Sequence, residues 1–160
     1  MELLDELTLC AIISDDKIKW VPTMEKKDIA LVQLRAAAKM YNAADYVSCL
    51  TLSGAAEEIL GKIAFRRTKS NEMENGVEFT KSIYTAFGKP VPLVKIIRDR
   101  INSVKNEVKH NDTGENSWVL ADFEFEASMK FVAAVKNHFR AYDKMPADRI
   151  IMKLFDNLTL

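Results

Sequence analysis

The chain has few of the residues on which metal and cofactor sites depend. Its 160 residues include two histidines and two cysteines. These scattered residues do not fit the ligand spacing of a structural zinc site. Glu107 and His110 form a single Glu-x-x-His pair, whereas di-iron bundles need that pair on two helices and further glutamates. We therefore expect neither a metal nor a cofactor.

Glycine-rich loops and nucleophile elbows are also missing. No Gly-x-Ser-x-Gly sequence occurs, and Gly54 and Gly61 both fall inside helix-forming sequence. The chain therefore carries no sequence signal for a serine hydrolase elbow, or for P-loop or Rossmann nucleotide binding. Cys10 and Cys49 lie far apart among apolar neighbours. This placement favours reduced core thiols and a cytoplasmic location over a disulfide.

An excess of one charge and long apolar runs are absent as well. Lys and Arg together number 23, as do Asp and Glu, so the formal net charge is zero. Because no overall field attracts polyanions, any nucleic-acid contact must be local. The chain starts with acidic residues, and its apolar run over residues 7–13 is short. We expect no signal peptide, no transmembrane helix and no membrane partner.

Helical periodicity, in contrast, is abundant. Apolar residues at spacings of three and four predict helices over about 24–41, 43–67, 77–87, 91–109 and 120–142, with a short final helix after Pro146. Residues 69–76 read as a polar loop. The helix over 43–67 is apolar around most of its circumference, so we expect it at the centre. We predict an all-α, up-and-down bundle of five to seven helices, with residues 23–160 as a single domain.

Residues 1–22 form an N-terminal extension of uncertain structure. Leu7, Leu9, Ala11 and Ile13 alternate as in a strand, but an overlapping pattern fits a helix. Since no other segment reads as a sheet partner, we favour the helix.

The stretch that carries the most chemistry is the helix over 91–109 and the histidine that follows it. Beside an apolar seam lies a polar ridge at helical spacing, made of Arg98, Asn102, Lys105 and Lys109. The ridge ends at His110. A histidine that titrates near neutrality beside cations and an amide can move a proton while its neighbours hold a phosphate. In the alternative interpretation, His110 only stabilises the negative end of its helix.

Three further features have both structural and functional interpretations. Glu57 and Glu58 lie in the central helix and need a partner if buried, which Arg98, Arg100 or Lys105 is expected to supply. His138 lies among aromatic residues, as a packed histidine would. A basic cluster is either the positive end of a helix or a phosphate-binding patch, and consists of Lys62, Arg66, Arg67 and Lys69.

Residues 105–110, Lys-Asn-Glu-Val-Lys-His, resemble the motif of the HEPN superfamily (higher eukaryotes and prokaryotes nucleotide-binding). The usual signature of that family is an arginine, a polar residue that is often asparagine, three variable residues and a histidine. Residues 44–61 are similar to the long helix of uncharacterised bacterial HEPN-like proteins. The resemblance covers roughly residues 24–142. It implies a helical homodimer in which two copies of the motif share a cleft.

The resemblance also implies an activity. Active HEPN proteins are metal-independent endoribonucleases, commonly in toxin–antitoxin and other defence systems, so RNA and an antitoxin protein are the implied partners. By analogy, His110 would act on the ribose 2′-hydroxyl or the leaving oxygen, Asn106 would position the phosphate, and Lys105 would stabilise negative charge. Supporting phosphate-binding charge would come from Arg98, Arg100 and Lys109.

Position 105 departs from the family pattern. It is lysine rather than arginine, and an ammonium group cannot reproduce the bidentate contact of a guanidinium group with phosphate. Many HEPN domains are non-catalytic. Two hypotheses therefore stay open: an RNA-directed protein with a metal-independent endoribonuclease site, and a non-catalytic dimeric module that binds a protein partner.

Overall fold

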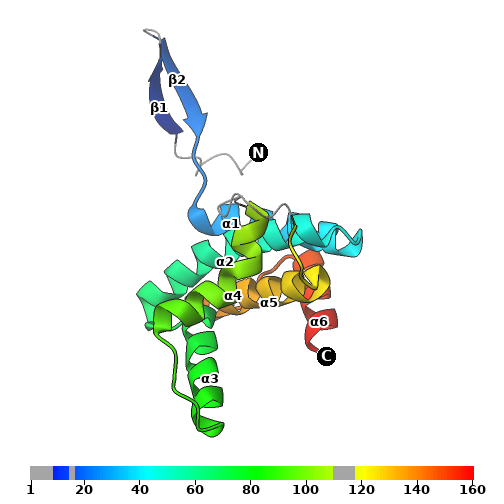
Figure 1. Ribbon diagram of the computed structural model, residues 1–160. Helices are drawn as coiled ribbons and strands as arrows, with labels where there is room; N and C mark the ends of the chain where they lie inside the picture. The colour runs from blue at the N-terminus through cyan, green and yellow to red at the C-terminus, as the bar shows by residue number, and fades with distance from the viewer. Residues whose placement is uncertain (1–8, 15–16, 110–117) are drawn as a thin grey trace.

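The computed structural model describes residues 9–14, 17–109 and 118–160, with side chains from Thr23 onward. In this part of the chain six helices pack into a bundle, which confirms the expected all-α fold (Figure 1). The helices are α1 Lys26–Asn42, α2 Tyr46–Thr68, α3 Glu72–Ala86, α4 Val94–Lys109, α5 Phe123–Tyr142 and α6 Arg149–Thr159. None of these helices is long and apolar enough to cross a membrane.

Short polar side chains begin four of the helices by accepting hydrogen bonds from free backbone N–H groups. These N-caps are Asp45, Asn71, Asp122 and Asp148. Asn71 binds the N–H of Glu74 at 2.9 Å, so α3 starts at Glu72. The predicted loop over 69–76 is therefore wrong in its second half. Its polar composition concealed a capped helical turn whose polar residues belong to the first turn of α3.

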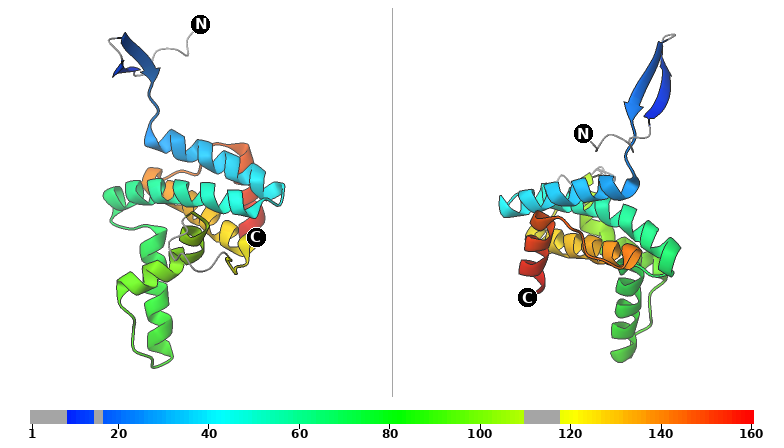
Figure 2. Two further views of the ribbon diagram at one scale, coloured as in Figure 1. Left: turned by 45° about the horizontal axis from the view of Figure 1, so that its top comes forward. Right: turned by 180° about the vertical axis from the view of Figure 1, so that it is seen from behind.

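The N-terminal segment is a β-hairpin rather than the helix that we favoured. Strands β1 Leu9–Ser14 and β2 Lys17–Pro22 pair in antiparallel fashion, with Leu9 opposite Pro22 and Ser14 opposite Lys17. The hairpin stands apart from the helices in every view (Figures 1 and 2). The alternation of Leu9, Ala11 and Ile13 was thus the correct signal for β1. The expectation that no other segment could serve as its sheet partner was wrong, because the next segment in sequence, β2, pairs with β1.

Helix α2 forms the centre of the bundle, as its apolar circumference predicted. α1 and α5 pack along it, and α4 crosses it (Figure 2). Leu50, Ala56 and Leu60 of α2 are fully buried against Phe131 and its neighbours on α5. Cys49 is also fully buried and is a free thiol.

Helices α3 and α4 complete the fold on one side of α2. The predicted apolar seam of α4 faces inward: Ile97 is only 1% exposed, and Val104 and Val108 pack against the core. α3 packs against α4 and α5 and extends away from the other helices (Figure 1). This arrangement places the polar side of α4 against α2, α3 and α5.

Candidate functional site

Lys105, the cation of the HEPN-like motif, is buried. Its residue is 3% exposed, and its Nζ atom donates a hydrogen bond to Oε1 of Glu58 on α2 at 2.5 Å. The aliphatic chain of Lys105 crosses Gly54, where an added Cβ atom would lie 2.5 Å from Lys105 Cδ. A glycine at position 54 therefore lets the lysine lie flat against α2. Of Arg98, Arg100 and Lys105, the expected partners of the α2 carboxylates, Lys105 is the one that bonds to Glu58, whose side chain is 48% exposed.

This pairing changes the titration of Glu58. Burial raises the pKa of its carboxyl group, but the hydrogen bond and charge of Lys105 act in the opposite direction, with help from the charges of Lys109 and Lys62. The net effect is a pKa below the usual range. Glu58 thus stays ionised over the neutral range and holds Lys105 in place.

The two arginines of the predicted phosphate-binding group contact α3. Arg98 donates to Oε1 of Glu74 at 2.5 Å, and Arg100 donates to the hydroxyl group of Tyr84 at 2.9 Å. Both arginines are nonetheless exposed. They pair with the neighbouring helix and do not lie beside Lys105.

Asn106 and Lys109 lie at the C-terminal end of α4. Asn106 is exposed, whereas Lys109 is half-buried. Because successive residues on a helix point in different directions, Asn106 faces solvent while Lys105 faces α2. His110, the predicted proton-transfer residue, lies outside the described residues.

Glu57, the other carboxylate of the central helix, faces a cation that sequence reasoning missed. Lys130 of α5 is 6% exposed, and its Nζ atom lies 3.9 Å from Oε2 of Glu57. The same Nζ atom donates to Oδ1 of Asn102 at 2.9 Å. A signal was present: Lys130 lies three residues after Ala127 and four before Ala134, on the buried face of its helix. A charged residue within an apolar face needs a buried partner.

Burial has a strong effect on Lys130. Desolvation lowers the pKa of its ammonium group, and the charge of Lys105 lowers it further, while the nearby carboxylates of Glu57, Glu126 and Glu58 raise it. Desolvation outweighs the carboxylates. Five residues, Glu57, Glu58, Asn102, Lys105 and Lys130, are here called the polar cluster and lie between α2, α4 and α5. Glu57, Lys105 and Lys130 are buried, Asn102 is half-buried and Glu58 is exposed.

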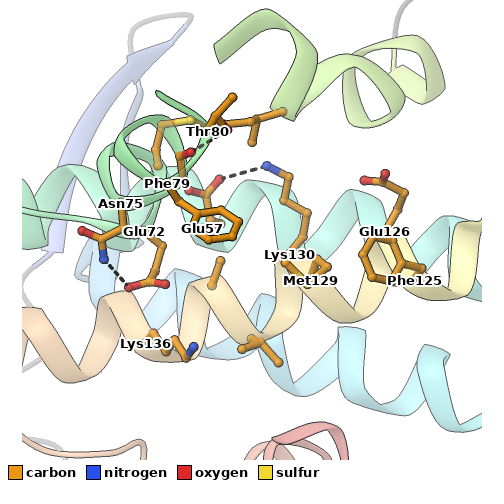
Figure 3. A pocket seen from close by; sticks show the side chains of 15 residues that line it. Glu57, Glu72, Asn75, Phe79, Thr80, Phe125, Glu126, Met129, Lys130 and Lys136 are labelled. Carbon is orange, nitrogen blue, oxygen red and sulfur yellow. Dashed lines mark hydrogen bonds and ion pairs between the residues drawn. The ribbon is translucent and has the colours of Figure 1, made fainter. Parts of the chain in front are cut away.

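A pocket of about 490 Å³ opens between α3 and α5, with Glu57 and Lys130 among its lining residues. Its walls are mostly apolar and include Met73, Phe79, Ile101, Phe125 and Met129. Figure 3 shows the Glu57 carboxylate and the Lys130 ammonium group turned toward one another, with Phe79 beside Glu57. The pocket is thus an apolar space with two opposite charges inside it.

Two of the remaining sequence candidates, His138 and Arg67, have structural partners. His138 is 3% exposed, and its Nδ1 atom lies 3.0 Å from the carbonyl oxygen of Lys144. Burial lowers the pKa of this imidazole, and the charges of Lys27 and Lys144 lower it further. The hydrogen bond to the backbone of Lys144 acts in the opposite direction, but the net pKa is lowered. From the predicted basic cluster, Arg67 donates to the carbonyl oxygen of Ala141 at 2.5 Å. The other members, Lys62, Arg66 and Lys69, are exposed.

Two tests bear on the site as a whole. Within the described ranges, no group of His, Cys, Asp and Glu side chains has the arrangement to hold a metal ion. Comparison with protein-family models, curated proteins and solved structures finds no match for this chain. The HEPN resemblance therefore remains a prediction from residues 44–61 and 105–110.

Proposed function

We propose that this chain is a HEPN-like helical module that acts by binding a protein partner and does not cleave RNA. The observation that carries this proposal is the position of Lys105. A cation that stabilises charge developing on a phosphate must be aimed at that phosphate. Lys105 is buried against α2 and bonded to Glu58. Turning it outward would break this bond and leave an unfilled space over Gly54.

An RNA cleavage assay tests the proposal directly. Purified wild-type protein and the variant His110→Ala are incubated with a mixed set of RNAs in EDTA, which excludes metal-dependent contaminants. We expect no cleavage above a no-protein blank with either protein. Metal-independent cleavage by the wild type that is lost in His110→Ala would overturn the proposal.

The surface that best suits a protein partner is the tip of α3 and the segment after it, here called the α3 tip. Residues 82–94 contain one charged residue, Lys89. The exposed apolar side chains in this segment are Ile83, Phe87, Val91 and Leu93, and Phe87 and Leu93 are each 74% exposed. A projecting apolar surface with little charge is typical of the centre of a protein interface.

The partner that we propose for the α3 tip is a second copy of this chain. The formal net charge of zero means that two copies do not repel one another. α3 extends away from the other helices, so two copies can bring their tips together without a clash between bundles (Figure 2). This dimer differs from the one implied by the HEPN resemblance, because the α3 tip adjoins the start of α4 and the motif lies at the end of that helix.

Sedimentation equilibrium with full-length protein tests the dimer. The wild type is expected to sediment as a dimer and Phe87→Glu as a monomer with an unchanged circular dichroism spectrum. Val32→Glu is the matched control, because Val32 is 57% exposed on α1, away from the tip. A wild type that stays monomeric, or a Phe87→Glu protein that stays dimeric, would contradict the proposed interface.

An RNA-directed function is the second candidate, and one observation favours it. The charges of Lys62 and Lys109 both act on Glu58, so the two lysines lie near the end of α4 that precedes His110. Lys62 is exposed and Lys109 half-buried, in positions where they can contact phosphates. Salt-dependent RNA binding that is lost on charge reversal of Lys62 and Lys109 would support this function. No salt-dependent RNA binding by the wild type would exclude it, and binding unaffected by both reversals would exclude these two lysines as the site.

A further inference from the structure

The carboxylate of Glu57 pairs with Lys130 and receives no direct side-chain hydrogen bond from the described residues. The residue is nonetheless only 4% exposed. Its nearest cation, Nζ of Lys130, is 3.9 Å away, beyond hydrogen-bond distance. Buried carboxylate oxygens are almost always satisfied by donors. The acceptor atoms of Glu57 border the pocket between α3 and α5 and are available to a ligand inside it.

Lys130 brings the opposite charge to the same place. Its ammonium group has three protons, and one of them is donated to Asn102 at 2.9 Å. The remaining donors have no partner closer than Glu57 at 3.9 Å among the residues described. The pocket therefore has at its border an acceptor and a donor of opposite charge, paired with one another at 3.9 Å and each able to make further hydrogen bonds.

The walls of the pocket select for an apolar body. Phe79, Ile101, Phe125 and Met129 line a volume of about 490 Å³, which falls within the range of small-molecule sites. Phe79 lies beside Glu57, and Met129 and Phe125 follow along α5 (Figure 3). A molecule bound here would place its charged end at Glu57 and Lys130 and its apolar end among these side chains.

We propose that this pocket binds a small zwitterion with a large apolar group, of the chemical class of the apolar α-amino acids. Its ammonium group binds Glu57, its carboxylate binds Lys130, and its side chain contacts Phe79. A simple cation would meet the charge of Lys130 in a medium of low dielectric constant, and a simple anion would meet that of Glu57. A zwitterion adds no net charge and satisfies both groups.

Calorimetric titration of the full-length protein with L-phenylalanine tests the class of ligand. Two comparison compounds keep the aromatic ring but lose one charge: phenethylamine has no carboxylate, and 3-phenylpropionate has no ammonium group. L-phenylalanine is expected to bind at least about tenfold more tightly than either, because each compound leaves one buried charge without its partner. No saturable binding of L-phenylalanine, or equal binding of the three compounds, would overturn the proposal.

Variants of the lining residues test the location. Phe79→Ala is expected to weaken L-phenylalanine binding about fivefold or more, since it removes a ring from the wall. Phe79 is 67% exposed, so its removal leaves the core intact. The matched control is Phe65→Ala, which removes a 43% exposed ring on α2 outside the pocket lining and should leave the affinity unchanged. Equal affinity for wild type and Phe79→Ala would show that the ligand binds elsewhere.

Glu57→Gln supplies a second variant, in which the acceptor keeps its shape but loses its charge. A folded Glu57→Gln protein is expected to lose the preference for L-phenylalanine over 3-phenylpropionate. Should this variant not fold, the Phe79→Ala titration decides the location alone. The pocket site requires neither the proposed dimer nor an absence of RNA cleavage, so each proposal can fail separately.

Discussion

Removing the ammonium group of Lys130 tests whether the polar cluster holds the bundle together. In Lys130→Met the carboxylate of Glu57 stays buried without its counter-ion. Two unit charges 3.9 Å apart attract by about 4 kcal/mol at an effective dielectric constant of about 20. Breaking buried pairs in this way costs about 3–5 kcal/mol, because the remaining charge has no compensation. We expect the free energy of unfolding at pH 7 to fall by about 3 kcal/mol or more.

Urea denaturation followed by circular dichroism measures this loss, and a double-mutant cycle assigns it. Glu57→Gln combined with Lys130→Met removes both charges and keeps the shape of both side chains. The double variant is expected to be about 2 kcal/mol more stable than Lys130→Met alone, since no orphaned charge is left. The single and double variants should share the same m-value if both unfold in one step.

The ion pair between Lys81 and Glu78 is the control for exposure. Its Nζ–Oε1 distance is 2.7 Å, shorter than that of the buried pair, but the Glu78 side chain is 69% exposed. Lys81→Met should change the free energy of unfolding by no more than about 0.5 kcal/mol, because water screens the pair. Two results would refute the reasoning that burial makes this pair important for stability. One is a loss in the free energy of unfolding below about 1 kcal/mol in Lys130→Met, and the other is additive effects of the two substitutions in the double-mutant cycle.

Two further predictions concern pH and capping. Because burial lowers the pKa of His138, its neutral form stabilises the fold above about pH 6.5, and this stability is lost as the pH falls through the lowered pKa. The free energy of unfolding from urea titrations should thus drop more between pH 7 and pH 5 in wild type than in His138→Gln. Asp148→Ala removes both cap bonds of α6 and the ion pair with Arg35, so thermal denaturation should show a loss of about 1–2 kcal/mol. Asp156→Ala, an exposed change on the same helix, should stay within about 0.5 kcal/mol of wild type.

The helices were predictable because the signals that define them are local. The seam from Val94 to Val108 repeats at helical spacing and is the inward face of α4 in the structure. The polar stretch before residue 77 misled the prediction, although Asn71 followed by Glu72 and Glu74 is the sequence pattern of a capped first turn. The hairpin was missed for a different reason: the alternation of the first strand was visible, but residues 17–22 were not recognised as the strand that pairs with it.

The candidate site was harder to predict, because it depends on pairs that the sequence separates widely. Lys105 and Glu58 lie 47 residues apart, and Lys130 and Asn102 lie 28 apart. The need of the α2 carboxylates for a partner was readable from their apolar surroundings. Which cation pairs with which carboxylate could not be read from the sequence, because Lys105 reaches Glu58 only where Gly54 lets α4 approach α2.

The sequence alone therefore determined that this protein is a helical bundle around one small-residue helix, because spacing and capping act within a few residues. Only the tertiary structure decided what the motif lysine does. Lys105 and Asn106 are neighbours in sequence, but α4 buries the first and exposes the second, since packing against α2 sets the rotation of the helix. The same rotation joins Asn102 to Lys130, and Lys130 lies with Glu57 in the pocket between α3 and α5.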